Sequence, residues 1–241
     1  MPEDPPSSRV VVALDVPTLA EALAIVARLG DAAGAYKVGL QLLTAEGPAA
    51  LRALVAAGKA VFLDLKLHEI PNSVASAVDA AGRLGVGMVT VHASAGSAAL
   101  RAAVAAAAPH PGLRILALTV ITSLRDADLP EIGLAPSVRA QVERLADLAA
   151  ACGCHGVVAS ADEADWLAER LPAGMCVVTP GVQFADGPAT DQARVATPER
   201  ARRAGATHIV VGRAITRAAD PVAAFGAALA AMSRPRGGSG G

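Results

Sequence analysis

The sequence predicts an α/β protein that folds as a single (β/α)8 TIM barrel. Hydrophobic residues make up 53% of the chain and aromatic residues only 2%, so the core must be built from Ala, Val, Leu and Ile. Short apolar runs alternate with Ala-rich segments along most of the 241 residues. Eight strand-then-helix units of this length favour a closed barrel of parallel strands. The main alternative is an open doubly wound sheet, which typically has a glycine-rich turn after the first strand. The segment at this position, Asp15-Val16-Pro17-Thr18, contains no glycine.

Each apolar or β-branched run is expected to be a strand, and the Ala-rich stretch that follows it is expected to be a helix. The expected strands are residues 9–14, 35–39, 60–65, 88–92, 113–120, 156–159, 175–179 and 208–211. The expected helices are residues 19–29, 45–57, 72–84, 96–107, 136–151, 162–170, 198–204 and 221–232.

End signals support several of these helices. Ser160 and Thr197 are suitable N-caps, because a side-chain oxygen there can accept a hydrogen bond from the first helical turn. Proline suits a first helical turn and glycine suits the position after a helix end. The prolines are Pro198 and Pro221, and the glycines are Gly30, Gly58, Gly85 and Gly205.

The barrel domain is expected to span residues 1–232, followed by a disordered Gly/Ser-rich tail at 233–241. Two connections, 121–135 and 180–197, are long and rich in turn-forming residues. Because both follow strands at the carboxyl side, they are where lids and binding segments are expected.

Charge and hydropathy exclude several classes of partner. A formal net charge of −1 with scattered Lys and Arg provides no basic stripe, and there is no aromatic platform for bases, so a nucleic acid polymer is not expected as a ligand. No apolar run reaches the length of a membrane span, and the segment 1–6 lacks the features of a secretion signal. We therefore expect no membrane association and a cytoplasmic location.

The cysteines agree with a reducing compartment. Cys152, Cys154 and Cys176 are odd in number and form no disulfide framework. The cluster Cys152-Gly153-Cys154-His155 offers too few ligands for a metal site, and we interpret it as packing at a helix end.

The most informative segment is Asp64-Leu65-Lys66-Leu67-His68-Glu69, at the end of the third expected strand. Side chains alternate faces along a strand, so Asp64 and Lys66 are expected to point to one face and Leu65 to the other. Removing two charges from water costs several kcal/mol per ion, and a fold seldom keeps such a pair for stability alone. A structural ion pair is the alternative, but a functional pair is favoured.

A barrel of this kind carries its chemistry at the carboxyl ends of its strands. Asp15 and Lys37 stand at the ends of the first two strands, so two lysines and two aspartates are predicted to meet in one cavity. For His92, at the end of the fourth strand, we favour a structural role in which it hydrogen-bonds a neighbouring loop.

The last two units indicate a phosphate site. The chain runs from the strand 208–211 through Gly212 and Arg213 into a helical start, so backbone N–H groups and a guanidinium can meet one anion. The turn Thr179-Pro180-Gly181-Val182-Gln183 follows the seventh strand in the corresponding place. The expected ligand is a phosphorylated small molecule.

These segments, taken together, resemble the orotidine 5'-phosphate decarboxylase family over nearly the whole chain. The matching segments are Val12-Ala13-Leu14-Asp15, Tyr36-Lys37-Val38-Gly39, 62–73, Val91-His92-Ala93-Ser94, 118–123, Thr179-Pro180-Gly181, Asp191-Gln192-Ala193-Arg194-Val195 and 209–221. Sugar-phosphate relatives share the Asp-x-Lys-x-x-acid pattern, whereas Ile70-Pro71-Asn72 and the late Asp-Gln-x-Arg segment resemble the orotidylate branch.

The resemblance implies decarboxylation of orotidine 5'-phosphate to uridine 5'-phosphate by a homodimer, with no metal and no organic cofactor. It implies that Lys66 stabilises the carbanion and donates the proton, within a charged array of Lys37, Asp64 and Lys66. Glu69 would complete this array from the partner subunit, so that the active site is shared across the interface. The implied substrate contacts are Asp15 and Lys37 to ribose, Ser73 from the partner, Thr122 and Ser123 at the pyrimidine edge, Pro180 at the base, and Gln192, Gly212 and Arg213 at the phosphate.

Three positions depart from the family pattern. Glu69 replaces the usual Asp, Ser73 replaces the usual Thr, and Gln183, a candidate substrate contact, stands where bacterial relatives often carry Arg. Two alternatives therefore stay open. One is a metal-dependent sugar-phosphate decarboxylase or aldolase of the same superfamily, and the other is a nucleotide-binding barrel whose catalysis is weakened by Glu69.

Overall fold

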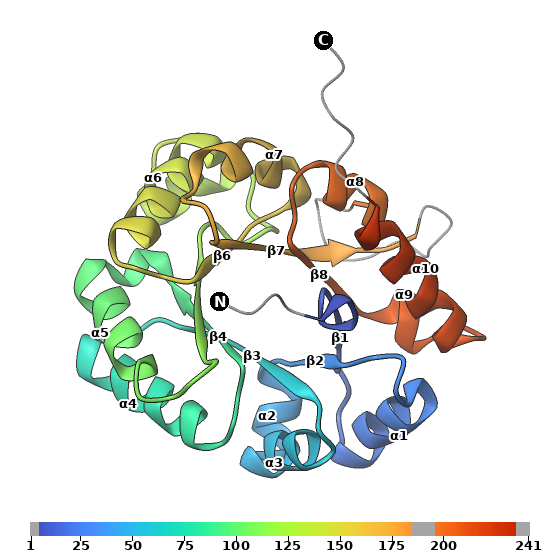
Figure 1. The fold of residues 1–241 in the computed structure, drawn as a ribbon. Coiled ribbons are helices and arrows are strands. Elements are labelled where there is room, and N and C mark those ends of the chain that lie inside the picture. The colour runs from blue at the N-terminus through green and yellow to red at the C-terminus, as the bar shows by residue number, and fades with distance from the viewer. Residues whose placement is uncertain (1–4, 185–195, 235–241) are drawn as a thin grey trace.

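The computed structural model describes residues 5–184 and 196–234 as a closed barrel of eight parallel strands in sequence order, surrounded by helices (Figure 1). The strands are β1 (Val10–Ala13), β2 (Ala35–Val38), β3 (Ala60–Leu67), β4 (Met88–His92), β5 (Arg114–Leu118), β6 (Gly156–Val158), β7 (Cys176–Val182) and β8 (His208–Val211). Strand β1 pairs with both β2 and β8, which closes the ring. The predicted barrel is confirmed.

The helices follow the strands as predicted, with additional short ones. They are α1 (Leu19–Leu29), α2 (Leu40–Glu46), α3 (Pro48–Ala56), α4 (Pro71–Arg83), α5 (Ser97–Ala107), α6 (Val138–Ala151), α7 (Ala161–Arg170), α8 (Pro198–Arg203), α9 (Arg213–Thr216) and α10 (Pro221–Ser233). Three 3-10 helices are η1 (Pro6–Ser8), η2 (Ala93–Ala95) and η3 (Asp126–Ile132).

The single helix expected over 45–57 was wrong, because two helices, α2 and α3, occupy this part of the chain. Gly47 separates them with a φ of 59°, a backbone conformation that favours glycine. Pro48 then begins α3, at a position where the missing N–H costs no hydrogen bond.

The predicted N-caps are confirmed. The Thr197 side chain accepts a hydrogen bond from the N–H of Arg200, and Ser160 forms a capping box with Glu163. The four predicted glycines each have positive φ and follow a helix end: Gly30, Gly58, Gly85 and Gly205.

The core has two layers, one inside the barrel and one between the barrel and the helices. Side chains such as Phe62, Met88 and Leu116 fill the barrel interior. Residues of the opposite strand parity, such as Val61 and Val89, pack with the helices in the outer layer. Some of these interior residues, including Phe62 and Leu118, also line a cavity in which polar side chains gather.

One of the two long connections contains a helical segment, and the other is described only in part. The connection over 121–135 contains η3, whose Asp126 accepts a hydrogen bond from the N–H of Val138. Residues 185–195 of the other connection, and residues 235–241 of the expected tail, lie outside the described residues. Helix α10 extends to Ser233, one residue beyond the expected barrel boundary.

Among the described residues, no helix is long and apolar enough to cross a membrane.

Candidate active site

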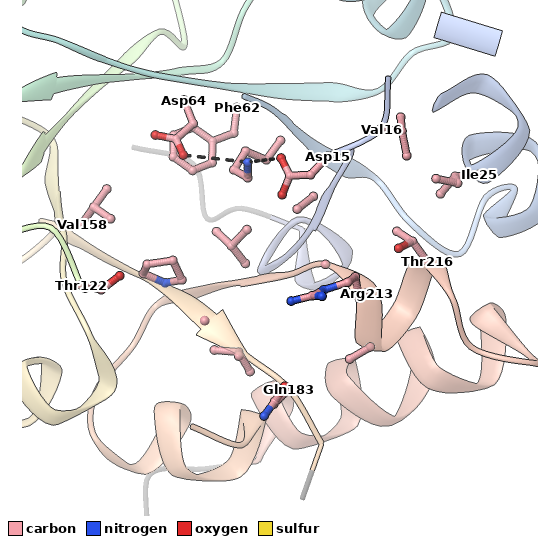
Figure 2. Close-up of a pocket in the computed structure, with 18 of the residues that line it drawn as sticks. Asp15, Val16, Ile25, Phe62, Asp64, Thr122, Val158, Gln183, Arg213 and Thr216 are labelled. Carbon is pink, nitrogen blue, oxygen red and sulfur yellow. Dashed lines mark hydrogen bonds and ion pairs between the residues drawn. The ribbon is translucent and has the colours of Figure 1, made fainter. Parts of the chain in front are cut away.

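A cavity of about 780 Å³ opens at the carboxyl ends of the strands (Figure 2). Most of the candidate residues predicted from the sequence line it, and they come from elements far apart in the chain. They are Asp15, Lys37, Asp64, Lys66, Thr122, Pro180, Gln183, Gly212 and Arg213.

Four charged side chains form a chain of alternating sign on one wall of the cavity. Lys37 Nζ lies 2.9 Å from Asp15 Oδ1 and 3.9 Å from Asp64 Oδ2. Lys66 Nζ lies 2.8 Å from the same Asp64 oxygen. The Lys37 and Asp64 side chains are only 11% and 14% exposed, whereas Lys66 is 35% exposed and therefore accessible from the cavity. The predicted convergence of two lysines and two aspartates is confirmed.

Simple alternation along a strand does not fully explain this convergence, because β3 is not a regular strand where it carries Asp64 and Lys66. Residue Leu63 pairs with Val89 and Leu67 pairs with Val91, so the register shifts between these two pairs. Three residues of β3 therefore lie opposite one residue of β4, which is a β-bulge. Within it, Lys66 has a φ of 51°, the one positive value among non-glycine residues of the described chain.

Thr90 of β4 lies opposite this bulge and is a residue that the sequence analysis missed. It is fully buried, and its hydroxyl contacts both Asp64 and the Lys66 backbone. The alternation of side chains could have found it. Thr90 is two residues before His92 on a strand whose interior positions are even-numbered, so a polar residue there must face the barrel interior.

The opposite side of the cavity carries the predicted phosphate residues. Figure 2 shows Arg213 and Gln183 across the cavity from Asp64. Gly212 leads from β8 into α9, so Arg213 and the first backbone N–H groups of α9 belong to the same short segment at this side of the cavity. Thr216 and Arg217, which the sequence analysis also missed, line the same side. They follow Arg213 by about one helical turn.

Apolar side chains form the floor between the charged wall and the phosphate side. Phe62, Leu118, Val158 and Val210 all line the cavity and belong to the core inside the barrel. A flat, weakly polar group can therefore rest on the interior core while its polar substituents reach the two walls.

Three of the predicted site residues that the structure describes do not line this cavity. Glu69 and Ser123 are exposed, and the Glu69 carboxylate accepts a hydrogen bond from the N–H of Ile70 at 2.7 Å. Ser73 lies in the first turn of α4. Gln192 lies outside the described residues.

His92 is placed as the structural interpretation predicted. Its Nδ1 hydrogen-bonds the Ser94 hydroxyl in the following turn at 2.6 Å, and its ring stacks on His68 with centroids 4.9 Å apart. Burial, together with the charges of His68 and Lys66, lowers the pKa of His92 below its ordinary value of 6.5. His92 therefore stays neutral near pH 7.

The cysteine cluster packs at a helix end, as predicted. Cys152 caps the carboxyl end of α6, and burial raises the pKa of the Cys154 thiol to about 12. Nδ1 of His155 accepts a hydrogen bond from the N–H of Ile115, so this nitrogen is occupied by the backbone. The described residues hold no group of three or more metal-ligating side chains of the His, Cys, Asp and Glu types.

Several known proteins similar to this chain share the description orotidine 5'-phosphate decarboxylase. The sequence profile of the "Orotidine 5'-phosphate decarboxylase / HUMPS family" matches residues 8–228. The orotidine 5'-phosphate decarboxylase of Laribacter hongkongensis is 50% identical over 229 residues, covering 94% of this chain and 93% of that protein. The enzyme of the same name from Anaeromyxobacter sp. strain K is 47% identical over 227 residues, covering 94% and 99%. The crystal structure of the orotidine 5'-phosphate decarboxylase from Lactobacillus acidophilus superposes with a TM-score of 0.83 at 34% identity, covering 93% and 99%.

Proposed function

The chain belongs to the orotidine 5'-phosphate decarboxylase / HUMPS family of enzymes, and we propose that it converts orotidine 5'-phosphate to uridine 5'-phosphate and carbon dioxide in pyrimidine synthesis. The observation that carries this proposal is the chain Asp15, Lys37, Asp64 and Lys66 beside an apolar floor. Eight curated relatives that are 46–50% identical to the chain carry the orotidine 5'-phosphate decarboxylase name.

The reaction needs a fixed positive charge next to one carbon atom. When the bond from C6 of the pyrimidine to its carboxylate breaks, carbon dioxide leaves and the electron pair stays on C6. This pair lies in the plane of the ring, where π delocalisation does not reach it. An ammonium held beside C6 stabilises the developing carbanion electrostatically and then transfers a proton to it. We assign this role to Lys66, which faces the cavity.

Asp64 and Lys37 support the ammonium. One Asp64 oxygen contacts Lys66 Nζ at 2.8 Å and holds it in place, and Lys37 approaches the same oxygen from the other side at 3.9 Å. Charges held in fixed positions by the protein are the condition under which electrostatic stabilisation is most effective. In this proposal the negative charge of Asp64 also repels the carboxylate of the bound substrate.

The cavity accommodates the rest of the nucleotide between its two walls. We propose that Asp15 and Lys37 bind the ribose hydroxyls, that Thr122 contacts the pyrimidine edge, and that Pro180 lines the base pocket. Gln183, Gly212 and Arg213 would bind the phosphate on the opposite side, with Gln192 as a further contact. Binding energy from this remote group can close the loops and position the ring over Lys66.

A homodimer would complete the site. Glu69 lies in the loop after β3 and Ser73 in the first turn of α4, and neither lines the cavity of its own chain. Ile70 between them is a large apolar residue that is 62% exposed. An exposed apolar side chain beside functional groups is typical of a protein interface. We propose that these residues enter the cavity of the partner subunit, with Ser123 contacting the base after the connection over 121–135 closes.

The experiment that tests this function follows the ultraviolet absorbance of orotidine 5'-phosphate with purified protein, with and without a chelator. We expect rapid consumption that the chelator does not change. Loss of activity in the chelator would favour the metal-dependent sugar-phosphate alternative. Tight binding of uridine 5'-phosphate without consumption of orotidine 5'-phosphate would favour a binding protein.

A matched pair of variants then tests the role of Lys66. Lys66→Ala should reduce turnover by at least about 1,000-fold, because the charge and the proton donor are both lost. Lys59→Ala removes the same kind of side chain just before the opposite end of β3, where Nζ donates to the carbonyls of Gly30 and Ala33. This control should keep its turnover. Near-normal turnover in Lys66→Ala would reject the assignment.

A further inference from the structure

Thr90 connects the two ends of the β3 bulge through one hydroxyl group. Its Oγ1 lies 2.8 Å from the backbone N of Lys66 and 2.9 Å from Oδ1 of Asp64. The Lys66 N–H can only donate, so the hydroxyl accepts this hydrogen bond. The hydroxyl proton is then directed to the carboxylate of Asp64, which can only accept when it is ionised.

This arrangement divides the two oxygens of Asp64 between two tasks. Oδ1 is held by the Thr90 hydroxyl, and Oδ2 is left to face Lys66 Nζ and Lys37 Nζ. A carboxylate held at one oxygen cannot rotate freely about its terminal torsion, so the second oxygen stays aimed at the two ammonium groups.

The same hydroxyl also stabilises an unusual backbone conformation. Lys66 has a φ of 51°, which is unfavourable for a residue with a Cβ and persists only where neighbouring groups hold it. The bulge places the Lys66 N–H opposite Thr90, and the hydroxyl receives this N–H inside the strand pair. Thr90 therefore controls the backbone from which the Lys66 side chain extends.

We propose that Thr90 is a positioning residue for catalysis, which orients Asp64 and holds the left-handed backbone of Lys66. The inference rests on the proposed function, in which Lys66 acts on C6. Thr90 does not line the cavity itself, so it acts on the substrate only through these two neighbours.

A structural role in core packing is the alternative, since Thr90 is fully buried. The two roles depend on different atoms of the side chain. Packing depends on the shape and the methyl group, whereas positioning depends on the hydroxyl. Thr90→Ser keeps the hydroxyl and loses the methyl group, and Thr90→Ala loses both. The Ser and Ala variants therefore differ by the hydroxyl alone. The wild type and Thr90→Val form a second such comparison, because valine has nearly the shape of threonine but no hydroxyl.

The test measures kcat and KM for orotidine 5'-phosphate, the Kd for uridine 5'-phosphate, and the Tm of each variant. We expect kcat of Thr90→Ser within about threefold of the wild type and kcat of Thr90→Ala at least about 30-fold lower, since small misplacements in a preorganised site cost this much. KM and the Kd for uridine 5'-phosphate should change by less than about threefold in both, because the phosphate side is untouched. Thr90→Val should behave like Thr90→Ala if it folds.

Thr207→Val is the matched control. The Thr207 hydroxyl also bridges two groups, since it accepts a hydrogen bond from the N–H of Val177 at 2.9 Å and donates one to the carbonyl of Val177 at 3.0 Å, but Thr207 precedes β8 and does not line the cavity. Its kcat should equal that of the wild type. Equal kcat values in Thr90→Ser and Thr90→Ala would overturn the proposal, as would a loss in Thr90→Ala that appears in KM and Kd instead of kcat.

Crystal structures separate a failure of this inference from a failure of the proposed function. If the wild type does not consume orotidine 5'-phosphate, the proposed function is wrong, and the structures of Thr90→Ser and Thr90→Ala then decide the role of Thr90. We expect the Ser variant to keep the Lys66 backbone and its contact with Asp64, and the Ala variant to lose one or both. Two unchanged structures would reject Thr90 as a positioning residue.

Discussion

Nζ of Lys66 lies 2.8 Å from Oδ2 of Asp64, and the two residues lie in a bulged strand in which Lys66 has a left-handed backbone. A left-handed conformation costs a non-glycine residue on the order of 1–2 kcal/mol. The chain therefore keeps a locally unfavourable backbone at the residue to which we assign the chemistry, as is common in functional sites.

The left-handed backbone of Lys66 predicts an unusual order of stability for two variants that should both be inactive, Lys66→Gly and Lys66→Ala. Lys66→Gly should be more stable than Lys66→Ala by about 1 kcal/mol, because glycine adopts positive φ readily and alanine does not. Urea unfolding of both variants measures this difference. In a regular strand the order would be reversed, so a more stable alanine variant would contradict the bulged backbone.

Asp64→Asn should lower kcat by at least about 100-fold, because Lys66 then lacks the negative partner that holds it in place. The amide has nearly the same shape, so the fold should survive, and circular dichroism checks this. A kcat within about tenfold of the wild type would argue against Asp64 as the residue that orients Lys66.

Arg213→Ala should lower kcat/KM by roughly 10- to 100-fold, the effect of losing a hydrogen bond between charged groups. The affinity for uridine 5'-phosphate should fall in parallel, while the affinity for uridine, which has no phosphate, should not change. Isothermal titration calorimetry with both ligands measures this. Arg52→Ala on α3, an exposed arginine outside the cavity lining, is the matched control. An equal loss of uridine affinity would place Arg213 elsewhere than at the phosphate.

A shared active site predicts complementation between two defective variants. Lys66→Ala and Glu69→Ala should each be nearly inactive alone. Mixed subunits would form hybrid dimers in which one site carries both defects and the other carries none. After unfolding and refolding of an equal mixture, activity should reach about one quarter of the wild-type value, since half of the dimers are hybrids and each has one intact site.

The control for this mixture is Lys66→Ala combined with Asp64→Asn. Both changes lie in the cavity of one chain, so each site of a hybrid keeps one defect and no activity should return. If the Lys66→Ala and Glu69→Ala mixture also stays inactive, Glu69 does not cross to a partner subunit.

Two half-buried histidines predict that stability falls on mild acidification. Burial is the main cause that lowers the pKa of His92 and of His155 below 6.5 in the folded protein. In the unfolded chain their pKa returns to about 6.5, so below that pH the unfolded state binds more protons and the free energy of unfolding decreases. The loss begins near pH 6.5 and grows until the pH reaches the lowered folded-state values.

Urea unfolding at pH 7.5 and pH 5.5 checks this dependence. His155→Gln should show a smaller decrease between the two pH values than the wild type, whatever its stability at pH 7.5. His155 is the better choice because its Nδ1 accepts from the Ile115 backbone and it is not in the candidate site. An unchanged decrease would show that His155 does not titrate with unfolding.

The sequence by itself determined the barrel and most of the residues at its mouth. Alternation of apolar runs and helical segments is a local property, and it is repeated in each unit with its own caps, as at Ser160 and Thr197. Because parallel strands all end at one side of a closed barrel, the strand ends with polar residues necessarily meet there. Asp15 and Lys37 could therefore be brought together without any structure.

Only the tertiary structure decided how the central pair is held. A bulge depends on the register between two strands, and the sequence of one strand alone does not determine that register. The sequence pattern placed Asp64 and Lys66 on one face by simple alternation, but the shifted register places Thr90 beneath them and turns the Lys66 backbone to positive φ. The hydrogen bonds of Thr90 join residues that are 24 and 26 positions apart, so they exist only once β3 and β4 have paired.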